Sequence, residues 1–268
     1  MNKLLRSLSD RSHAVADMFT GRGVRRERMA ALVGMMRPYG CGRPLVRVGG
    51  THDGGYLVPD DLEGIEYCFS PGVSDTATFE RDCLARGIRS FMADYSVDRP
   101  PEHLDGCRFI KKYLGARNDA KTITLDRWVD ESVGRDHDGD LLLQMDIEGA
   151  EFETLLAARE DTLSKFRVAV IEIHHSQRLR RRSVFRAWQA CFERLTRLFD
   201  VVHVHPNNCC GIVDVHGYPM PRVFEITLIR KDRVVSRRPV SSLPHPLDQS
   251  NEPDKPDLVL PAEWLEDG

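Results

Sequence analysis

The sequence predicts an α/β protein with a mostly parallel sheet that is covered on both faces. Strand-like and helix-like runs alternate between residues 65 and 231, which is typical of a parallel sheet. The runs at 141–146 and 166–173 are almost continuously apolar, as strands buried on both faces are. Polar residues follow several of these runs, at the strand ends where such sheets bind ligands.

The elements that precede this alternation differ in texture. Residues 2–38 have apolar residues at helical spacing, and a break at residues 21–23 leaves a second helix over 25–36. A short strand is expected at 45–50, followed by the turn-rich segment THDGGYLVPDD. We therefore expect an N-terminal helical extension over 1–43, which covers the acceptor site or forms a homodimer contact.

The main domain is expected over 44–240. Strands are predicted at 65–70, 90–96, 108–114, 141–146, 166–175, 200–206 and 223–231. Helices are predicted at 76–87, at 121–133 with a start near Thr124, at 150–159 and at 183–199. The segment that joins the last two strands has no clear helix, so the final strand is expected to be antiparallel to its predecessor. The proline-rich residues 241–268 are expected to form an irregular tail over the domain, or one that is partly disordered.

Composition excludes several classes of protein. The net charge is −3 over 268 residues, whereas a general nucleic-acid binder is usually clearly basic. No stretch has the roughly 20 apolar residues of a membrane span, and the N-terminus lacks the apolar core of a secretory signal. The seven cysteines form no C-x-x-C pair, so reduced and mostly buried thiols are expected. These observations predict a cytoplasmic protein without nucleic-acid or membrane partners.

The turn after the first sheet strand, FSPGVSDTATFE, occupies the usual nucleotide-binding corner but contains only one glycine, Gly72. A pyrophosphate needs close backbone approach across several glycines. A single glycine favours a ligand without phosphate at this turn, such as S-adenosylmethionine. Asp94 ends the next strand, where an acidic residue commonly binds ribose hydroxyls, and Tyr95 is placed to border an adenine. The alternative is that Asp94 caps a loop and Gly72 only makes a turn.

Four blocks of the sequence together carry a family resemblance. The run DIEGAEFETLL (146–156) resembles the hallmark of the FkbM-type S-adenosylmethionine-dependent methyltransferases, and FSPGVSDTATFE, HDGGYLVPDD and HVHPNN resemble other blocks of one branch. The resemblance covers about residues 44–231. It implies a Rossmann-like seven-stranded methyltransferase sheet with the last strand antiparallel. It also implies methyl transfer, often to oxygen on a sugar or natural product. The Ser70-Pro71-Gly72 turn departs from the glycine-rich form of the family.

With this resemblance, the cofactor site is expected to be built from the ends of three strands. The residues assigned to it are Ser70, Gly72, Val73, Ser74, Asp94, Tyr95, Ser96, Asp146 and Ile147.

The expected catalytic residues end the two central strands. Asp146 is placed beside the methyl group, where it would take the acceptor proton, orient the acceptor or hold a divalent ion. His174 and His175 end the next strand, and neighbouring strand residues point to opposite faces, so only one should face the acceptor. No metal ligand is assigned, and a divalent ion stays open.

The acceptor site is expected to use residues from other strand ends and loops. Asp53 either closes a tight turn or lines the mouth of the site, Glu148 either binds substrate or suits a helix N-terminus, and Arg178 either faces solvent or attracts an acidic substrate. The expected substrate-binding residues are Asp53, Tyr56, Glu148, His205, Asn207, Asn208 and Arg178.

Two other functions compete with an O-methyltransferase of a sugar, polysaccharide precursor or small natural product, phosphorylated acceptors included. One is a nicotinamide-dependent oxidoreductase on a similar sheet, which the missing glycines of the turn disfavour. The other is a non-catalytic module with a methyltransferase fold. N-methylation also stays open, since an amine acceptor would use the same carboxylate.

Overall fold

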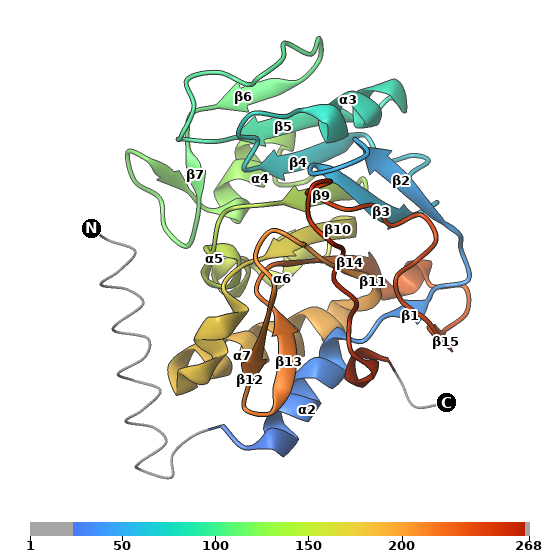
Figure 1. The fold of residues 1–268 in the computed structure, drawn as a ribbon. Helices are drawn as coiled ribbons and strands as arrows, with labels where there is room; N and C mark the ends of the chain where they lie inside the picture. The colour runs from blue at the N-terminus through green and yellow to red at the C-terminus, as the bar shows by residue number, and fades with distance from the viewer. Residues whose placement is uncertain (1–23, 266–268) are drawn as a thin grey trace.

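The computed structural model describes residues 24–265 and contains one seven-stranded sheet (Figure 1). The predicted first helix therefore lies outside the described residues. The strand order is β11-β14-β10-β9-β4-β5-β6. The bounds are β4 Tyr67–Pro71, β5 Arg89–Ala93, β6 Arg108–Ile110, β9 Leu141–Met145, β10 Phe166–Ile173, β11 Phe199–Pro206 and β14 Phe224–Arg230.

All pairings are parallel except those of β14, which runs antiparallel to both β10 and β11. The α/β class and the Rossmann-like seven-stranded sheet with its last strand antiparallel are therefore confirmed.

Helices cover one face of this sheet, and mixed structure covers the other. Side chains alternate along β9: Leu141, Leu143 and Met145 enter one core, and Leu142 enters the other. The first core is shared with α2 Arg26–Met36, α4 Leu125–Val133, α5 Glu151–Ala157 and α7 Arg182–Leu198. The second is shared with a single helix, α3 Thr78–Ala85, and with the hairpin of β2 Leu45–Gly49 and β3 Gly55–Pro59.

Local sequence explains where the covering helices begin and which face they bury. Thr124 caps α4 by accepting a hydrogen bond from the backbone N–H of Arg127 at 3.3 Å, which confirms the predicted start of that helix. In α7 the buried residues Phe185, Trp188, Phe192 and Leu195 recur at helical spacing. The short α6 Glu160–Leu163 joins α5 to β10.

Two connections differ from the sequence prediction. The strand expected over 108–114 divides: β6 joins the main sheet, whereas β7 Tyr113–Leu114 pairs with β8 Thr122–Ile123. The β11–β14 connection contains an unpredicted hairpin of β12 Ile212–Val215 and β13 Tyr218–Pro221. Its turn, His216-Gly217, has φ of 54° and 82°, as tight hairpin turns require at both central positions.

The C-terminal tail is irregular and lies against the domain. Its residue Asn251 donates to Glu225 of β14 at 2.7 Å, and the indole of Trp264, in a short 3-10 turn over Ala262–Trp264, is fully buried. The preceding β15 Arg238–Pro239 pairs with β1 Tyr39–Gly40, so the N-terminal extension and the end of the predicted main domain are in contact. The division at residues 43 and 240 stays a prediction.

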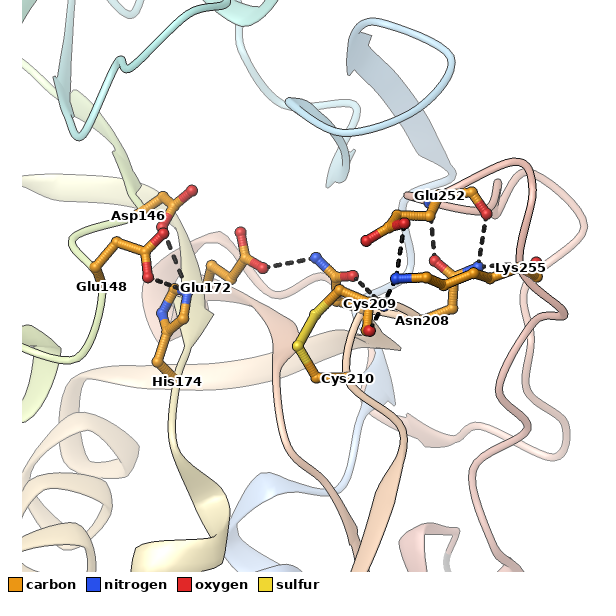
Figure 2. The surroundings of a disulfide bond; sticks show 10 residues. Asp146, Glu148, Glu172, His174, Asn208, Cys209, Cys210, Glu252 and Lys255 are labelled. Carbon is orange, nitrogen blue, oxygen red and sulfur yellow. Dashed lines mark hydrogen bonds and ion pairs between the residues drawn. A yellow bond between two sulfur atoms is a disulfide. The ribbon is translucent and has the colours of Figure 1, made fainter. Parts of the chain in front are cut away.

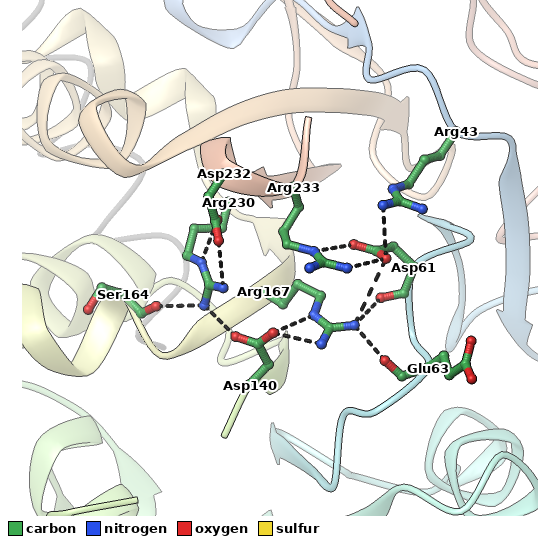
Figure 3. Close-up of polar contacts among 9 residues, drawn as sticks. All are labelled: Arg43, Asp61, Glu63, Asp140, Ser164, Arg167, Arg230, Asp232 and Arg233. Carbon is green, nitrogen blue, oxygen red and sulfur yellow. Dashed lines mark hydrogen bonds and ion pairs between the residues drawn. The ribbon is translucent and has the colours of Figure 1, made fainter. Parts of the chain in front are cut away.

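An arginine–aspartate network closes the sheet at the amino ends of β9 and β10 (Figure 3). Arg167 donates to the Asp140 carboxylate at 2.7 Å and to the backbone carbonyl of Asp61 at 2.9 Å. Arg233 binds the Asp61 carboxylate through two nitrogens, each at 2.8 Å. This network is far along the strands from their carboxyl ends, so we read it as structural.

Two further expectations bear on the chain as a whole. Within residues 24–265, none of the helices combines the length and the hydropathy that a membrane crossing needs.

Cys209 and Cys210 form a disulfide (Figure 2), so the expectation of reduced thiols is wrong for this pair. Adjacent cysteines leave no spacing signal of the kind that predicts a disulfide framework. The other described cysteines are free, and all but Cys107 are buried.

Candidate functional site

A cavity of about 790 Å³ opens at the carboxyl ends of β4, β5 and β9. This is the sheet edge at which the sequence places its polar residues. The lining includes predicted residues from all three strand ends, and it adds residues of the β7–β8 segment and of α5. It consists of Gly72, Ser74, Ala93, Asp94, Ser96, Tyr113, Leu114, Gly115, Ala116, Arg117, Thr122, Asp146, Ile147, Glu148, Ala150 and Glu153.

Gly72 lets the turn after β4 meet the end of β9. Its φ is +89°, and a Cβ atom there would lie 1.5 Å from the carbonyl oxygen of Asp146. No other residue type fits this approach. The glycine is therefore required by the neighbouring strand.

Asp94 braces two turns that line the cavity. The side chain is buried, and one carboxylate oxygen accepts from the backbone N–H of Ser74 at 3.0 Å. The other accepts from the N–H and hydroxyl of Ser96, both at 2.7 Å. A carboxylate has about four acceptor positions, so these three bonds leave room for one more. The loop-capping alternative is realised here, and the ribose contact stays a prediction.

Other predicted cofactor residues lie beside the large cavity without lining it. The Ser70 hydroxyl is fully buried and bonds Glu80 and, at 2.6 Å, Gln144. Val73 lines a smaller cavity of about 110 Å³ that is shared with Asp53 and Tyr56. The two cavities meet at Gly72, Ser74, Asp146 and Glu148.

An aromatic pair stands at the β7 side of the cavity. Tyr95, predicted to border an adenine, packs on Tyr113 with ring centroids 5.1 Å apart. Tyr113 rather than Tyr95 lines the cavity, and its side chain is 47% exposed. Tyr113 therefore has the lining position that was expected for Tyr95, because the chain after β6 forms β7 beside the cavity.

Asp146, Glu148 and His174 converge where the two cavities meet (Figure 2). The Nε2 atom of His174 lies 3.7 Å from Asp146 Oδ1 and 3.6 Å from Glu148 Oε2. Its Nδ1 atom lies 2.9 Å from Glu151 Oε1. His175 takes a left-handed backbone with φ of 63°, and its ring packs under Gly149. Of the two candidate histidines, the structure brings only His174 to Asp146.

The surroundings shift the pKa values of these groups. Burial raises the pKa of Asp146 to about 7, with the Glu148 charge adding to the rise and His174 opposing it. Burial lowers the pKa of His174, but its hydrogen bond to Glu151 and the neighbouring carboxylates outweigh this and raise it. Burial and the charge of Arg178 lower the pKa of His175. Asp146 is therefore a carboxylate that exchanges a proton near neutral pH.

Four predicted substrate residues lie outside both cavities. His205 faces Glu225 with 3.6 Å between Nδ1 and Oε2, and Asn208 donates to the tail at Ser250, 2.9 Å away. Arg178 lies in the 3-10 turn Ser176–Arg180. Asn207 donates at 2.8 Å to Glu172, a buried residue of β10 whose pKa the nearby charge of Asp146 helps to raise. Their roles in substrate binding stay predictions.

Sequence reading missed several residues that shape the site. Glu151 is fully buried and orients His174 through a hydrogen bond. It belongs to the DIEGAE run that was singled out in the sequence, so that motif was the signal that could have identified it. Glu172 interrupts an otherwise apolar strand, which is also a recognisable signal. Burial raises the pKa of Glu172 well above its usual range, and the charges of Asp146 and Glu225 raise it further.

One family domain matches the part of the chain that contains the site. Residues 96–199, which carry Asp146 and His174, match the methyltransferase FkbM domain. No curated protein matches the chain. Among solved structures, a fibrillarin/Nop5p complex is similar with 12% identity and a TM-score of 0.37, covering 63% of this chain and 74% of that one.

Two more solved structures are similar to the chain at low scores. A TehB-like SAM-dependent methyltransferase from Corynebacterium glutamicum has 12% identity and a TM-score of 0.31, covering 86% of this chain and 100% of that one. Thermoplasma acidophilum 1320 has 9% identity and a TM-score of 0.31, covering 63% and 80%. Over residues 96–199 the chain is therefore similar to the methyltransferase FkbM domain.

Proposed function

We propose that this methyltransferase uses S-adenosylmethionine to methylate a hydroxyl oxygen of a sugar, a polysaccharide precursor or a small natural product, phosphorylated acceptors included. One observation carries the proposal. Asp146, a carboxylate whose pKa burial raises to about 7, lines a cavity of about 790 Å³ at the carboxyl ends of β4, β5 and β9. A methyl acceptor with a hydroxyl group needs a proton acceptor of this kind beside it.

The residues of the cavity fit S-adenosylmethionine. The volume falls within the range of roughly 300–1,000 Å³ that is usual for small-molecule sites. Asp94 keeps acceptor capacity for ribose hydroxyls, and the exposed ring of Tyr113 offers a face for adenine. Asp146, Glu148 and Glu153 line the cavity and complement a sulfonium charge. The single glycine of the β4 turn offers no cradle for the pyrophosphate of NAD.

The chain's own residues account for the proton. When bound, S-adenosylmethionine supplies an electrophilic methyl group, and its transfer leaves S-adenosylhomocysteine. Asp146 orients the acceptor hydroxyl and takes its proton as the carbon–oxygen bond forms. His174, held by Glu151 at 2.9 Å, lies beside Asp146 and stabilises its charged form before transfer.

The proposal extends to partners and location. The nearly neutral net charge of −3 supports a small-molecule or saccharide acceptor rather than nucleic acid. We keep a cytoplasmic enzyme without a membrane partner, and a homodimer through the N-terminal extension, as parts of the proposal.

Titration calorimetry with S-adenosylmethionine, S-adenosylhomocysteine and NAD tests the cofactor. We expect saturable binding of both sulfur nucleosides, weaker binding in Asp94→Ala, and unchanged binding in Asp98→Ala, whose carboxylate is exposed and pairs only with Lys111 among the described contacts. Thermal melts confirm that each variant is folded. Binding of NAD alone would move the chain to the oxidoreductase class, and binding of neither would contradict the proposal.

A further inference from the structure

Asp146, Glu148 and His174 lie close together where the two cavities meet, but no hydrogen bond joins these three side chains. One donor atom from each of Asp146, Glu148 and His174 lies within 4.8 Å of the other two. The two carboxylates contact the same imidazole nitrogen, at 3.7 and 3.6 Å, which is beyond hydrogen-bonding distance. The distances from the imidazole nitrogen to the two carboxylate oxygens are therefore longer than direct hydrogen bonds would be.

Glu151, which is not one of the three residues, orients the His174 ring toward the two carboxylates. Its side chain is only 8% exposed. The Nδ1 atom is engaged by Glu151 Oε1 at 2.9 Å, and Glu151 is itself fully buried. A carboxylate that accepts the proton of one ring nitrogen fixes the ring and leaves the other nitrogen to act as a ligand. Nε2 therefore belongs to a buried side chain and faces the carboxylates of Asp146 and Glu148.

Asp146 supplies a buried atom that has no hydrogen-bond partner. Its Oδ1 atom is inaccessible to solvent and has no hydrogen-bond partner. A buried polar atom without a partner destabilises the folded state, so such atoms usually have a functional reason. The side chain as a whole is 25% exposed, so its exposure lies elsewhere than on Oδ1.

The backbone conformation at Glu148 places its carboxylate beside His174. Glu148 has φ of 56°, a left-handed conformation that is uncommon for a residue other than glycine. Its side chain is 83% exposed, yet its carboxylate turns back to His174 (Figure 2). Unusual backbone conformations of this sort cluster at ligand-binding sites.

We propose that Asp146, Glu148 and His174 form a site for a divalent metal ion. Two carboxylates and one imidazole suit Mn²⁺ or a neighbouring transition metal better than Mg²⁺ or Ca²⁺, which prefer all-oxygen sites. Glu151 is the positioning residue for the imidazole. Three protein ligands are fewer than such an ion usually binds, so coordination positions would remain for other ligands.

What the ion does there rests on the proposed function. An acceptor hydroxyl that binds the ion beside the methyl donor loses its proton more readily, because a bound cation lowers the pKa of a ligating oxygen. Asp146 Oδ1 faces the ion, and the second oxygen of the same carboxylate remains to take that proton. The methyl carbon then bonds to the acceptor oxygen as its bond to sulfur breaks.

Electron paramagnetic resonance of free Mn²⁺, with no cofactor present, tests the site. We expect one saturable Mn²⁺ site in the wild-type chain and a loss of affinity of at least about tenfold in Glu148→Gln, as for other changes around metal ligands. The control is Glu153→Gln, because Glu153 lines the same cavity but does not belong to the three-residue set. The two variants remove the same charge, so a difference between them reports coordination. Both side chains are exposed, and neither variant is expected to unfold the chain.

A second pair of variants addresses the imidazole. His174→Gln should abolish Mn²⁺ binding, whereas His175→Gln should retain it, with thermal melts to confirm folding. No saturable binding of Mn²⁺ by the folded wild-type chain would overturn the inference, since the imidazolium itself would then balance the carboxylates. Equal weakening in Glu148→Gln and Glu153→Gln would overturn it too. Calorimetry with S-adenosylhomocysteine on the same samples separates this outcome from a failure of the proposed function.

Discussion

Gly72 and Asp146 lie in contact through their backbones, so closely that a Cβ atom on Gly72 would be 1.5 Å from the Asp146 carbonyl oxygen. The backbone N–H of Asp146 also donates to the carbonyl of Pro71 at 3.2 Å. These contacts join the carboxyl ends of β4 and β9 at the point where the cavity begins. The turn after β4 and the residue that we propose as the base, Asp146, are therefore held against each other by backbone contacts.

Gly72→Ala is expected to lower both stability and cofactor binding. The left-handed backbone alone costs an alanine roughly 1–2 kcal/mol, and the collision with the Asp146 carbonyl adds to this. Gly87→Ala is the matched control, because Gly87 has φ of +81° but open space around it. Chemical unfolding should show a larger loss in Gly72→Ala than in Gly87→Ala. Equal losses would mean that the strand ends separate without cost.

Asp146→Asn is expected to stop turnover while keeping the cofactor. The amide cannot take a proton from the acceptor, and general-base catalysis typically contributes about 10²–10⁴ to the rate. Release of S-adenosylhomocysteine measures turnover once a screen has found an acceptor, and calorimetry measures cofactor affinity. A variant that retains full turnover would show that Asp146 is not the base.

The sequence was informative where short-range pattern decides structure. The apolar runs at 141–146 and 166–173 predicted β9 and β10, and Thr124 predicted the start of α4, because burial and capping act within a few residues. The sequence also placed Asp146 at the end of β9, and ligand sites follow the carboxyl ends of parallel strands. In the structure Asp146 lines the cavity there.

The remaining parts of the site depend on contacts between distant segments. The bond between Glu151 and His174 joins residues 23 positions apart, and nothing local to either indicates it. Tyr113 lines the cavity because β7 leaves the main sheet to pair with β8, and no glycine or proline between β6 and β7 signals this break. His205 and Asn208 looked available in the sequence, but the tail and β14 occupy their polar atoms.

Acidification is expected to loosen the tail through Asp248. Burial tends to raise the pKa of Asp248, but a hydrogen bond from His203 at 2.8 Å, nearby histidine charges and the N–H of His245 hold it below its ordinary value. A carboxylate whose pKa is lowered by folding stabilises the folded state above its unfolded pKa of about 3.9. That contribution disappears as the pH falls through the lower folded value.

Melting curves of wild type and Asp248→Asn between neutral pH and about pH 3 test this, since the unfolded Asp pKa of about 3.9 lies in that window. The wild-type chain should be the more stable at neutral pH, and the difference between the two should narrow toward the acidic end. A difference in stability that stays constant across the range would show that Asp248 acts by shape rather than by charge.

Trp264 is expected to carry most of the stability that the tail provides. Its ring is fully buried, lies 5.4 Å from that of Phe224 on β14, and donates through Nε1 to the carbonyl of Pro219 at 3.3 Å. Replacing a buried tryptophan by alanine typically costs about 3–5 kcal/mol. Val259→Ala is the control within the same segment, because Val259 is 64% exposed and should change little. Chemical unfolding that shows equally small effects for both substitutions would mean that the tail is only loosely attached to the domain.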